Sequence, residues 1–223
     1  MELNRKLAVE FIGMFLFMFT VGMATEKTTG AGNLAPIAIG FVLMVLVFAG
    51  GHISGGHYNP AVSTAVLIRG KMAPNEWVAY VILQLVAAVL AGLLVRGVGG
   101  HEAAATVAGD GKMLVVEFLF TFALAFVVLN VATARGTEGN SFYGLAIGGT
   151  VVVGAFAVGG ISGGAFNPAI ALGACVTGLF KWSNYWIYLI ADLLGGAAGA
   201  AAFLFVQPEE KLTGDLDAAS TRA

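Results

Sequence analysis

The sequence predicts an all-α integral membrane protein with six transmembrane helices and two short re-entrant half-helices. Composition is the first indication, since 58% of the 223 residues are hydrophobic, only 11% are charged and the mean hydropathy is +0.88. Soluble domains are about 45–50% apolar and about 25% charged. The second indication is that a motif in the first half of the chain recurs in the second half. Together these observations predict an inverted repeat in a membrane.

Six apolar blocks have the length of roughly 20 residues that a helix needs to cross the hydrocarbon layer. The first follows Arg5 and Lys6, as a secretory signal would, but its length and the internal Glu10 favour a retained span. The six predicted spans are Leu7–Thr25, Leu34–Gly51, Trp77–Val95, Met113–Val131, Phe142–Gly160 and Asn184–Val206.

Two further segments, His52–Arg69 and Ile161–Lys181, are glycine-rich at the start and then too short to span. Non-helical backbone at membrane depth is tolerated only where it is buried in protein or lines a wet cavity. We expect each segment to be a loop that enters the membrane and continues as a half-helix. A surface loop is the alternative.

An internal repeat favours the re-entrant interpretation. Ile53–Ala61 and Ile161–Ala169 match at seven of nine positions, at an offset of 108 residues. Glu10-Phe11 matches Glu117-Phe118 at an offset one residue shorter. Each unit has three spans, so the second copy enters the membrane inverted and the two half-helices meet near the midplane. We expect one domain over residues 1–206, with halves of about 1–105 and 106–206, followed by a flexible cytoplasmic tail at 207–223.

Each half-helix is predicted to begin at an Asn-Pro pair, Asn59-Pro60 and Asn167-Pro168. Asparagine is a preferred N-cap, and proline suits the first helical position because its missing N–H would have no partner there. Taken singly, each pair is explained by helix initiation. When the two starts face each other, their side-chain amides become two fixed donors at mid-membrane, for which water is the simplest acceptor.

The glycines before each pair allow backbone conformations in which successive carbonyls face one side. We expect these carbonyls to form a row of acceptors that leads to the asparagines, opposite an apolar wall. The row comprises Gly55, Gly56, His57 and Tyr58 in the first half, and Gly163, Ala165 and Phe166 in the second.

Several function classes are excluded by what the sequence lacks. A net charge of −2 offers no electrostatic footprint for nucleic acid. The sequence contains no phosphate-binding loop, zinc motif or nucleophile elbow, so we expect neither an enzyme nor a bound metal or cofactor. The single cysteine, Cys175, cannot form an internal disulfide.

At these residues the chain resembles the aquaporin family, the major intrinsic proteins. The resemblance rests on His52–Ala61, on the second motif Asn167-Pro168-Ala169 and on Glu10-Phe11 with Glu117-Phe118. It implies a right-handed six-helix bundle with one pore per chain, assembled as a homotetramer in the lipid bilayer. It also implies a passive channel for water and small uncharged solutes, in which Asn59, Pro60, Ala61 and the second motif exclude ions and protons.

Two departures from the family pattern concern selectivity. The family usually has arginine directly after the second motif, where this chain has Ile170, and proline a few residues later, where it has Ala174. The resemblance places the family's four-residue constriction at Ile39, Ala155, Gly164 and Ile170. All four are small or apolar, which predicts a wider filter than in strict water channels. A channel mainly for urea, ammonia or glycerol is therefore an alternative.

Glu10 and Glu117 lie inside predicted spans, where ionisable groups are costly and usually paired or functional. The resemblance favours buried acceptors that hold the re-entrant loops, and a proton-coupled transporter is the alternative. With the N-terminus inside, five Lys or Arg residues fall on the cytoplasmic side and four outside. We therefore expect a multi-pass protein of the plasma membrane with both termini in the cytoplasm.

Overall fold

A computed structural model of the chain describes residues 2–26, 30–99 and 109–211, and within these ranges every regular element is helical. Six helices are long and apolar enough to cross a membrane. They are α1 (Leu3–Ala24), α2 (Ala35–Ser54), α4 (Pro74–Val98), α5 (Asp110–Ala132), α6 (Tyr143–Ser162) and α8 (Tyr185–Val206). Two short helices, α3 (Pro60–Ile68) and α7 (Pro168–Thr177), complete the predicted set, so the predicted fold class is confirmed.

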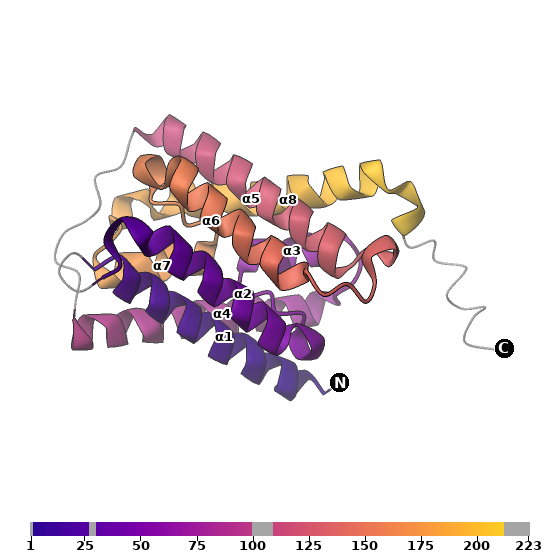
Figure 1. The fold of residues 1–223 in the computed structure, drawn as a ribbon, viewed down its shortest axis with the longest axis horizontal. Helices are drawn as coiled ribbons and strands as arrows, with labels where there is room; N and C mark the ends of the chain where they lie inside the picture. Colours follow the sequence, from indigo (N-terminus) through magenta and orange to yellow (C-terminus); the bar gives the residue numbers. More distant parts are fainter. Residues whose placement is uncertain (1, 27–29, 100–108, 212–223) are drawn as a thin grey trace.

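The helices run along the long axis of the molecule, with the start of α1 and the end of α8 at the same end (Figure 1). Four short 3₁₀ turns lie between or after them, at Gly32–Leu34, Arg135–Thr137, Trp182–Asn184 and Pro208–Glu210. Packing follows the repeat, because α1 contacts α2 and α4 just as α5 contacts α6 and α8. The half-helices cross over between repeats: α3 packs on α8, and α7 packs on α4.

The re-entrant loops begin later than the sequence predicted. Helix α2 continues through His52 to Ser54, and α6 continues to Ser162. Each helix ends only where a glycine adopts a left-handed conformation, with φ of 90° at Gly55 and 93° at Gly163. Such a residue is a common helix terminator, and glycine tolerates it without a Cβ clash. The loops are therefore five residues long, 55–59 and 163–167.

Small residues allow the two repeats to interlock. A Cβ atom at Gly196 of α8 would lie 2.5 Å from the carbonyl oxygen of Ala61 in α3. On the other side, a Cβ at Gly92 of α4 would lie 2.9 Å from the carbonyl oxygen of Gly173 in α7. Real Cβ atoms do not approach that closely, so these glycines set how near each half-helix comes to its neighbour. Close backbone approach at small residues is typical of helix packing in membranes.

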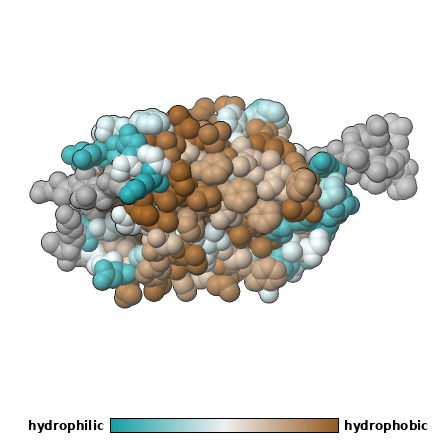
Figure 2. Space-filling view, turned by 90° about the horizontal axis from the view of Figure 1, so that it is seen from above, coloured by the Kyte–Doolittle hydropathy of each residue, from teal (hydrophilic) through white to brown (hydrophobic). Residues whose placement is uncertain are grey.

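The outer surface is apolar around its middle and polar towards both ends (Figure 2). Exposed apolar side chains lie on all six long helices, and include Ile12, Phe41, Ile82, Val115, Val153 and Leu194. Trp182 and Trp186 are 59% and 46% exposed at the start of the last span, where tryptophans anchor a helix at the membrane interface. This surface is that of an integral multi-pass membrane protein.

Contacts between the chain and the bundle continue beyond residue 206, after which the sequence predicts a flexible tail. Within the predicted tail 207–223, Glu210 is buried, and its carboxylate accepts a 2.6 Å hydrogen bond from the Arg69 side chain at the end of α3. The backbone N–H of Arg135, in the α5–α6 connection, donates to the same carboxylate at 2.7 Å. That hydrogen bond, with the charges of the two arginines, lowers the pKa of Glu210. Residues 212–223 lie outside the described residues.

Candidate functional site: two half-helices that meet inside the bundle

The site begins with two loops held in an unusual backbone conformation. Tyr58 and Phe166, the residues before the two asparagines, have φ of 46° and 49°. Residues other than glycine rarely adopt this left-handed region, and holding one there costs about 1–3 kcal/mol. Such a conformation persists only when the surroundings impose it. Both loops must therefore be held by contacts from outside themselves.

Glu10 holds the first loop from α1. One carboxylate oxygen, Oε1, accepts from the backbone N–H of His57 at 2.9 Å and from Ser54 Oγ at 2.7 Å. The other, Oε2, accepts from the backbone N–H of Tyr58 at 2.8 Å and from Gln84 Nε2 at 2.9 Å. Four donors thus converge on one fully buried carboxylate. An ionised carboxylate accepts hydrogen bonds through both oxygens, so four donors satisfy it well.

Glu117 occupies the matching place in the second repeat. It accepts from the backbone N–H groups of Ala165 and Phe166, at 3.1 and 2.7 Å, and from Ser162 Oγ. A tyrosine braces each helix end as well: Tyr80 donates to the Ser54 carbonyl, and Tyr188 donates to the Ser162 carbonyl. Glu10 and Glu117 thus each contact the backbone of the loop in their own repeat.

The side chains of Asn59 and Asn167 cap the half-helices. Asn59 Oδ1 accepts from the backbone N–H of Ala61 at 2.8 Å, and Asn167 Oδ1 accepts from Ala169 at 2.9 Å. Pro60 and Pro168 take the first helical positions. With the oxygen engaged in capping, each amide NH₂ is directed away from its own helix.

These two amides form a crossed pair that the sequence did not predict. Asn59 Nδ2 donates to the carbonyl of Phe166, and Asn167 Nδ2 donates to the carbonyl of Tyr58, both at 2.8 Å. The two half-helix starts are therefore bonded directly to each other. An NH₂ group has two hydrogens, so each asparagine keeps one for another acceptor. The carbonyls of Tyr58 and Phe166, which the sequence predicts in the row of acceptors, each use one lone pair for this bond.

A narrow cavity lies beside the crossed pair. Asn59, Asn167 and His57 line it together with the loop residues Gly56, Ala165 and Phe166. Its remaining walls are apolar: Phe17, Leu43, Val62, Leu124, Val128, Ile147 and Val151. The volume open to the centre of a water-sized sphere is about 10 Å³, close to the least that holds one water. Polar loop residues and apolar helix residues therefore share the lining of a space that is large enough for about one water.

The residues that form the apolar wall were missed from the sequence. On α2, Leu43 lies in the cavity and Val47, one turn further on, lies in a larger vestibule of about 530 Å³. On α6, Val151 and Ile147 lie in the cavity, and Tyr143 lies in the vestibule. Four-residue spacing places such residues on one face of a helix. The 108-residue offset pairs Leu43 with Val151, so the repeat carried a signal for these positions.

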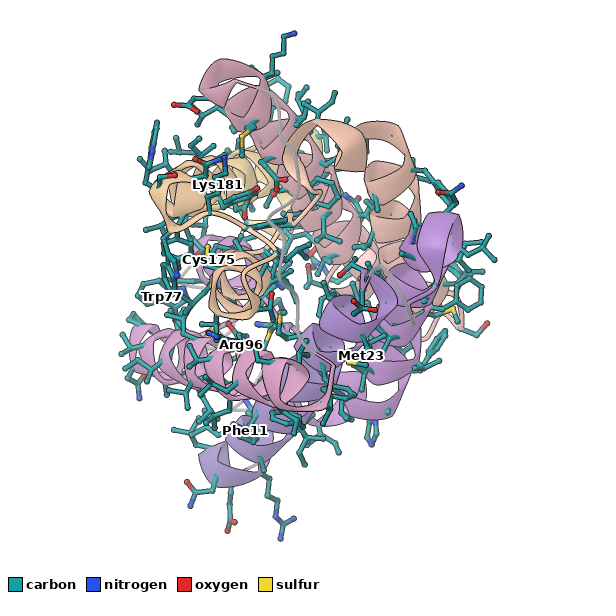
Figure 3. All side chains as sticks on the ribbon, turned by 90° about the vertical axis from the view of Figure 1, so that its left-hand side faces the viewer. Phe11, Met23, Trp77, Arg96, Cys175 and Lys181 are labelled. Atoms are coloured by element: carbon teal, nitrogen blue, oxygen red, sulfur yellow. The ribbon has the colours of Figure 1, made fainter. Side chains whose placement is uncertain are left out.

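The vestibule opens at the end of the bundle where α1 begins and α8 ends. Its polar lining comes from the end of α2 and from the α5–α6 connection, and includes His52, Lys71, Arg135, Glu138 and Asn140. Figure 3 shows the bundle from the opposite end. There, Lys181 and Arg96 lie near α7, the half-helix that contacts both α4 and α8.

The four residues of the expected constriction lie beyond the central cavity and are absent from the lining described for it. Ile39 is one turn before Leu43 on α2, and Ala155 is one turn after Val151 on α6, both on the side away from the vestibule. Gly164 lies beside α6, since a Cβ there would be 3.5 Å from the Ala155 Cα. Ile170 is buried in the first turn of α7.

Within the described residues, no group of three or more His, Cys, Asp or Glu side chains could hold a metal ion. The features that remain are two half-helices that meet at their starts, a small cavity beside them and a larger vestibule, enclosed by six helices that are long and apolar enough to span a membrane. An inverted repeat of this kind, with half-helices that meet inside a bundle of apolar helices, is typical of membrane channels and transporters.

Comparison with known proteins identifies the family. Residues 1–204 match the sequence model of the family described as Major intrinsic protein, and the chain belongs to it. It is 36% identical over 218 residues to Aquaporin NIP1-4 of Oryza sativa subsp. japonica, covering 94% of this chain and 78% of the relative. It is also 36% identical to Nodulin-26 of Glycine max (93% and 79% covered) and 37% identical to Aquaporin TIP4-2 of Zea mays (86% and 81%).

The fold is also found in a solved structure. The X-ray structure of the aquaglyceroporin from Plasmodium falciparum superposes with a TM-score of 0.78 at 20% identity, covering 94% of this chain and 99% of that one. The predicted family resemblance is thus confirmed. The chain is a membrane channel of the aquaporin family for water and small solutes, and not an enzyme.

Proposed function

We propose that the chain conducts water and small uncharged solutes passively and in single file, through the cavity beside Asn59 and Asn167. The crossed amide pair carries this proposal. Each asparagine retains one N–H beside a space that fits one water, and the facing wall is apolar. A water at this place accepts both hydrogen bonds through its oxygen, so its own hydrogens point towards the two exits. A chain of waters oriented in this way does not relay protons past the centre.

The same arrangement opposes cations. The N-terminus of a helix carries about +0.5 elementary charge, so α3 and α7 together place about one positive charge at the centre. A monovalent cation about 4 Å away is repelled by about 4 kcal/mol at an effective dielectric constant near 20. Loss of its hydration shell in the narrow cavity adds to this barrier. Among the described residues that line the cavity, none is acidic.

A wider range of solutes is the second candidate, and Ile170 favours it. The proposed constriction would then contain no charged or aromatic side chain, because it would consist of Ile39, Ala155, Gly164 and Ile170. Urea, ammonia and glycerol would then pass more readily than in relatives with arginine at the position of Ile170. The names of the similar proteins include both aquaporins and an aquaglyceroporin, which accords with either solute range.

A proton-coupled transporter built on Glu10 and Glu117 is less well supported. The hydrogen bonds to Glu10 come from the first loop and from Ser54 and Gln84, and those to Glu117 come from the second loop and from Ser162 at the end of α6. Neither residue lines the described cavity or vestibule. Both carboxylates therefore serve as loop anchors in this proposal.

The proposed assembly is a homotetramer with one pore per chain, in the plasma membrane and with both termini in the cytoplasm. The vestibule would then face the cytoplasm, since it lies at the end of the bundle where α1 begins and α8 ends.

Purified protein in liposomes tests the channel proposal. Stopped-flow light scattering would measure water, urea, glycerol and ammonia permeability in one preparation without an ion gradient. We expect rapid water flux above that of protein-free vesicles, together with flux of at least one of the other solutes. Solute flux that requires a proton or ion gradient would overturn the passive mechanism.

A further inference from the structure

The lining of the small cavity gives way to that of the vestibule within one helical turn. On α2, Leu43 lines the cavity, and Val47, four residues later, lines the vestibule. On α6, Ile147 lines the cavity, and Tyr143, four residues earlier, lines the vestibule. Four residues of helix span about 6 Å. A space of about 530 Å³ and a space of about 10 Å³ are therefore one helical turn apart.

The first loop and α3 supply the other side of this transition. Gly56 lines the cavity, and a Cβ atom there would lie 3.4 Å from the Cα of Val47. Val62 lines the cavity from the first turn of α3. Because α3 runs from Asn59 towards the end of the bundle where α8 ends, Val62 lies on the vestibule side of Asn59. The residues at this transition form an inner ring, which comprises Val47, Gly56, Val62 and Ile147.

Helices α2 and α6 approach each other closely enough to make this part of the bundle narrow. A Cβ atom at Gly40 of α2 would lie 2.6 Å from the carbonyl oxygen of Gly148 in α6, and a Cβ at Gly148 would collide with the carbonyl oxygen of Gly40. These two glycines thus set the separation of the helices that carry Val47 and Ile147. Both of these side chains are buried, as is that of Val62.

The inverted repeat gives the inner ring a counterpart on the other side of the asparagines. A Cβ atom at Gly164 would lie 3.5 Å from the Cα of Ala155, which repeats the contact of Gly56 with Val47 at an offset of 108 residues. Valine has two methyl groups more than a hydrogen-substituted Cβ, so the inner ring is the bulkier of the two at this position. Taken in the same order, the counterparts of the inner ring are Ala155, Gly164, Ile170 and Ile39, the residues of the proposed outer constriction.

The inner ring presents hydrocarbon to a solute that leaves the vestibule. Its three side chains belong to valine and isoleucine, which offer no hydrogen bond. A polar solute therefore loses hydration water on this side, and only polar groups of the loop can replace it. Closely packed side chains also yield little space to a larger molecule. Both effects favour water over urea and glycerol.

We propose that the inner ring is a second selectivity constriction, in series with the outer one, and that it sets the largest uncharged solute that passes. Val47, Val62 and Ile147 are the side chains that select by size. A solute must pass both constrictions in turn, so a wide outer constriction does not by itself admit glycerol. The inference rests on the proposed function and adds to it the residues that discriminate between solutes.

Replacement of Val47 tests the inner ring by the glycerol-to-water permeability ratio in liposomes. Val47→Ala gives α2 the residue that the outer constriction has at Ala155. We expect the ratio to rise about tenfold, since one methylene in a close-fitting apolar site changes discrimination by about 10- to 200-fold. The urea-to-water ratio should rise less, because urea is smaller than glycerol. The matched control is Val45→Ala, on the same helix but 51% exposed on the outer surface, and it should leave both ratios unchanged.

A second variant keeps the inference testable if Val47→Ala does not fold. Val62→Ala removes the same two methyl groups from another side of the inner ring, and it should raise the glycerol-to-water ratio in the same direction. A ratio is the appropriate measurement because a loosened bundle would raise the permeability of every solute in proportion. Such a proportional rise would contradict the inference.

The outcomes separate the inference from the proposed function. Water flux in the wild type with a glycerol-to-water ratio that is unchanged in Val47→Ala and in Val62→Ala would overturn the inner ring alone. Absence of water flux from the wild type would refute the proposed function, and the inner ring with it. A raised ratio in either variant, with no change in Val45→Ala, is the expected result.

Discussion

Substitution of Glu10 probes how strongly a buried carboxylate holds the first loop. In Glu10→Gln, one carboxylate oxygen becomes an NH₂ group that faces two donors, the backbone N–H of Tyr58 and Gln84 Nε2. The Gln84 amide can turn over and present Oε1, which has no donor in the wild type. The Tyr58 N–H has no such alternative and is left buried without an acceptor.

The expected cost follows from this count. One unsatisfied buried donor costs about 1–3 kcal/mol, so the loop should open about 5- to 150-fold more often in Glu10→Gln. In Glu10→Leu, the N–H groups of both His57 and Tyr58 lose their acceptor, and the expected cost is about 2–6 kcal/mol. The left-handed conformation of Tyr58 is then also unsupported.

Hydrogen exchange read by mass spectrometry, on peptides that cover residues 55–61, measures this opening. Exchange should rise from wild type to Glu10→Gln and again to Glu10→Leu. The matched control is Glu76→Gln, which removes a partly exposed ion pair with Lys6 and should leave these peptides unchanged. Exchange that is equal in wild type and Glu10→Leu would refute the role of Glu10 as an anchor.

Three further predictions concern the filter, a close contact and the C-terminal segment. Ile170→Arg should reduce urea and glycerol flux severalfold while sparing water in the liposome assay, and an equal loss of both would count against Ile170 as a filter residue. Gly13→Ala should lower the melting temperature by overpacking worth about 1–3 kcal/mol, because the new Cβ would lie 2.0 Å from a buried tyrosine ring, whereas Gly97→Ala, in open space, should not. Glu210→Gln should destabilise the protein at neutral pH by weakening its bond to Arg69. Because hydrogen bonding and nearby arginines depress the pKa of Glu210, that contribution is present above its unfolded value of about 4.3 and is lost as pH falls through the lower folded value. The difference in melting temperature between wild type and Glu210→Gln should therefore shrink in acid, and a difference that is constant with pH would contradict the assignment.

The features that the sequence predicted well are those specified locally. An asparagine cap followed by proline defines the start of a half-helix within a few residues, and the repeated motif at Asn59 and Asn167 showed that there are two. Span length follows from the apolar blocks because the hydrocarbon layer requires about 20 residues. The ends of α2 and α6 were placed three and two residues too early, because helix hydrogen bonds continue to the first glycine with positive φ.

The remaining features depend on contacts between distant parts of the chain. Asn59 and the carbonyl of Phe166 are 107 residues apart, and neither residue type indicates which acceptor the amide finds. The bond between Arg69 and Glu210 spans 141 residues and joins a half-helix to a segment expected to be flexible. The bond from Thr121 Oγ1 to Asp192 is likewise visible only once α5 and α8 are packed together.

The most direct test of the central claim is to measure water and proton flux together in the same liposomes. Stopped-flow light scattering would record the water flux, and a trapped pH-sensitive dye would record protons under an imposed pH gradient. If the crossed amides of Asn59 and Asn167 orient single-file water, the vesicles should shrink much faster than protein-free vesicles while proton entry stays at the protein-free rate. Slow shrinkage, or proton entry that rises in step with water flux, would contradict the account.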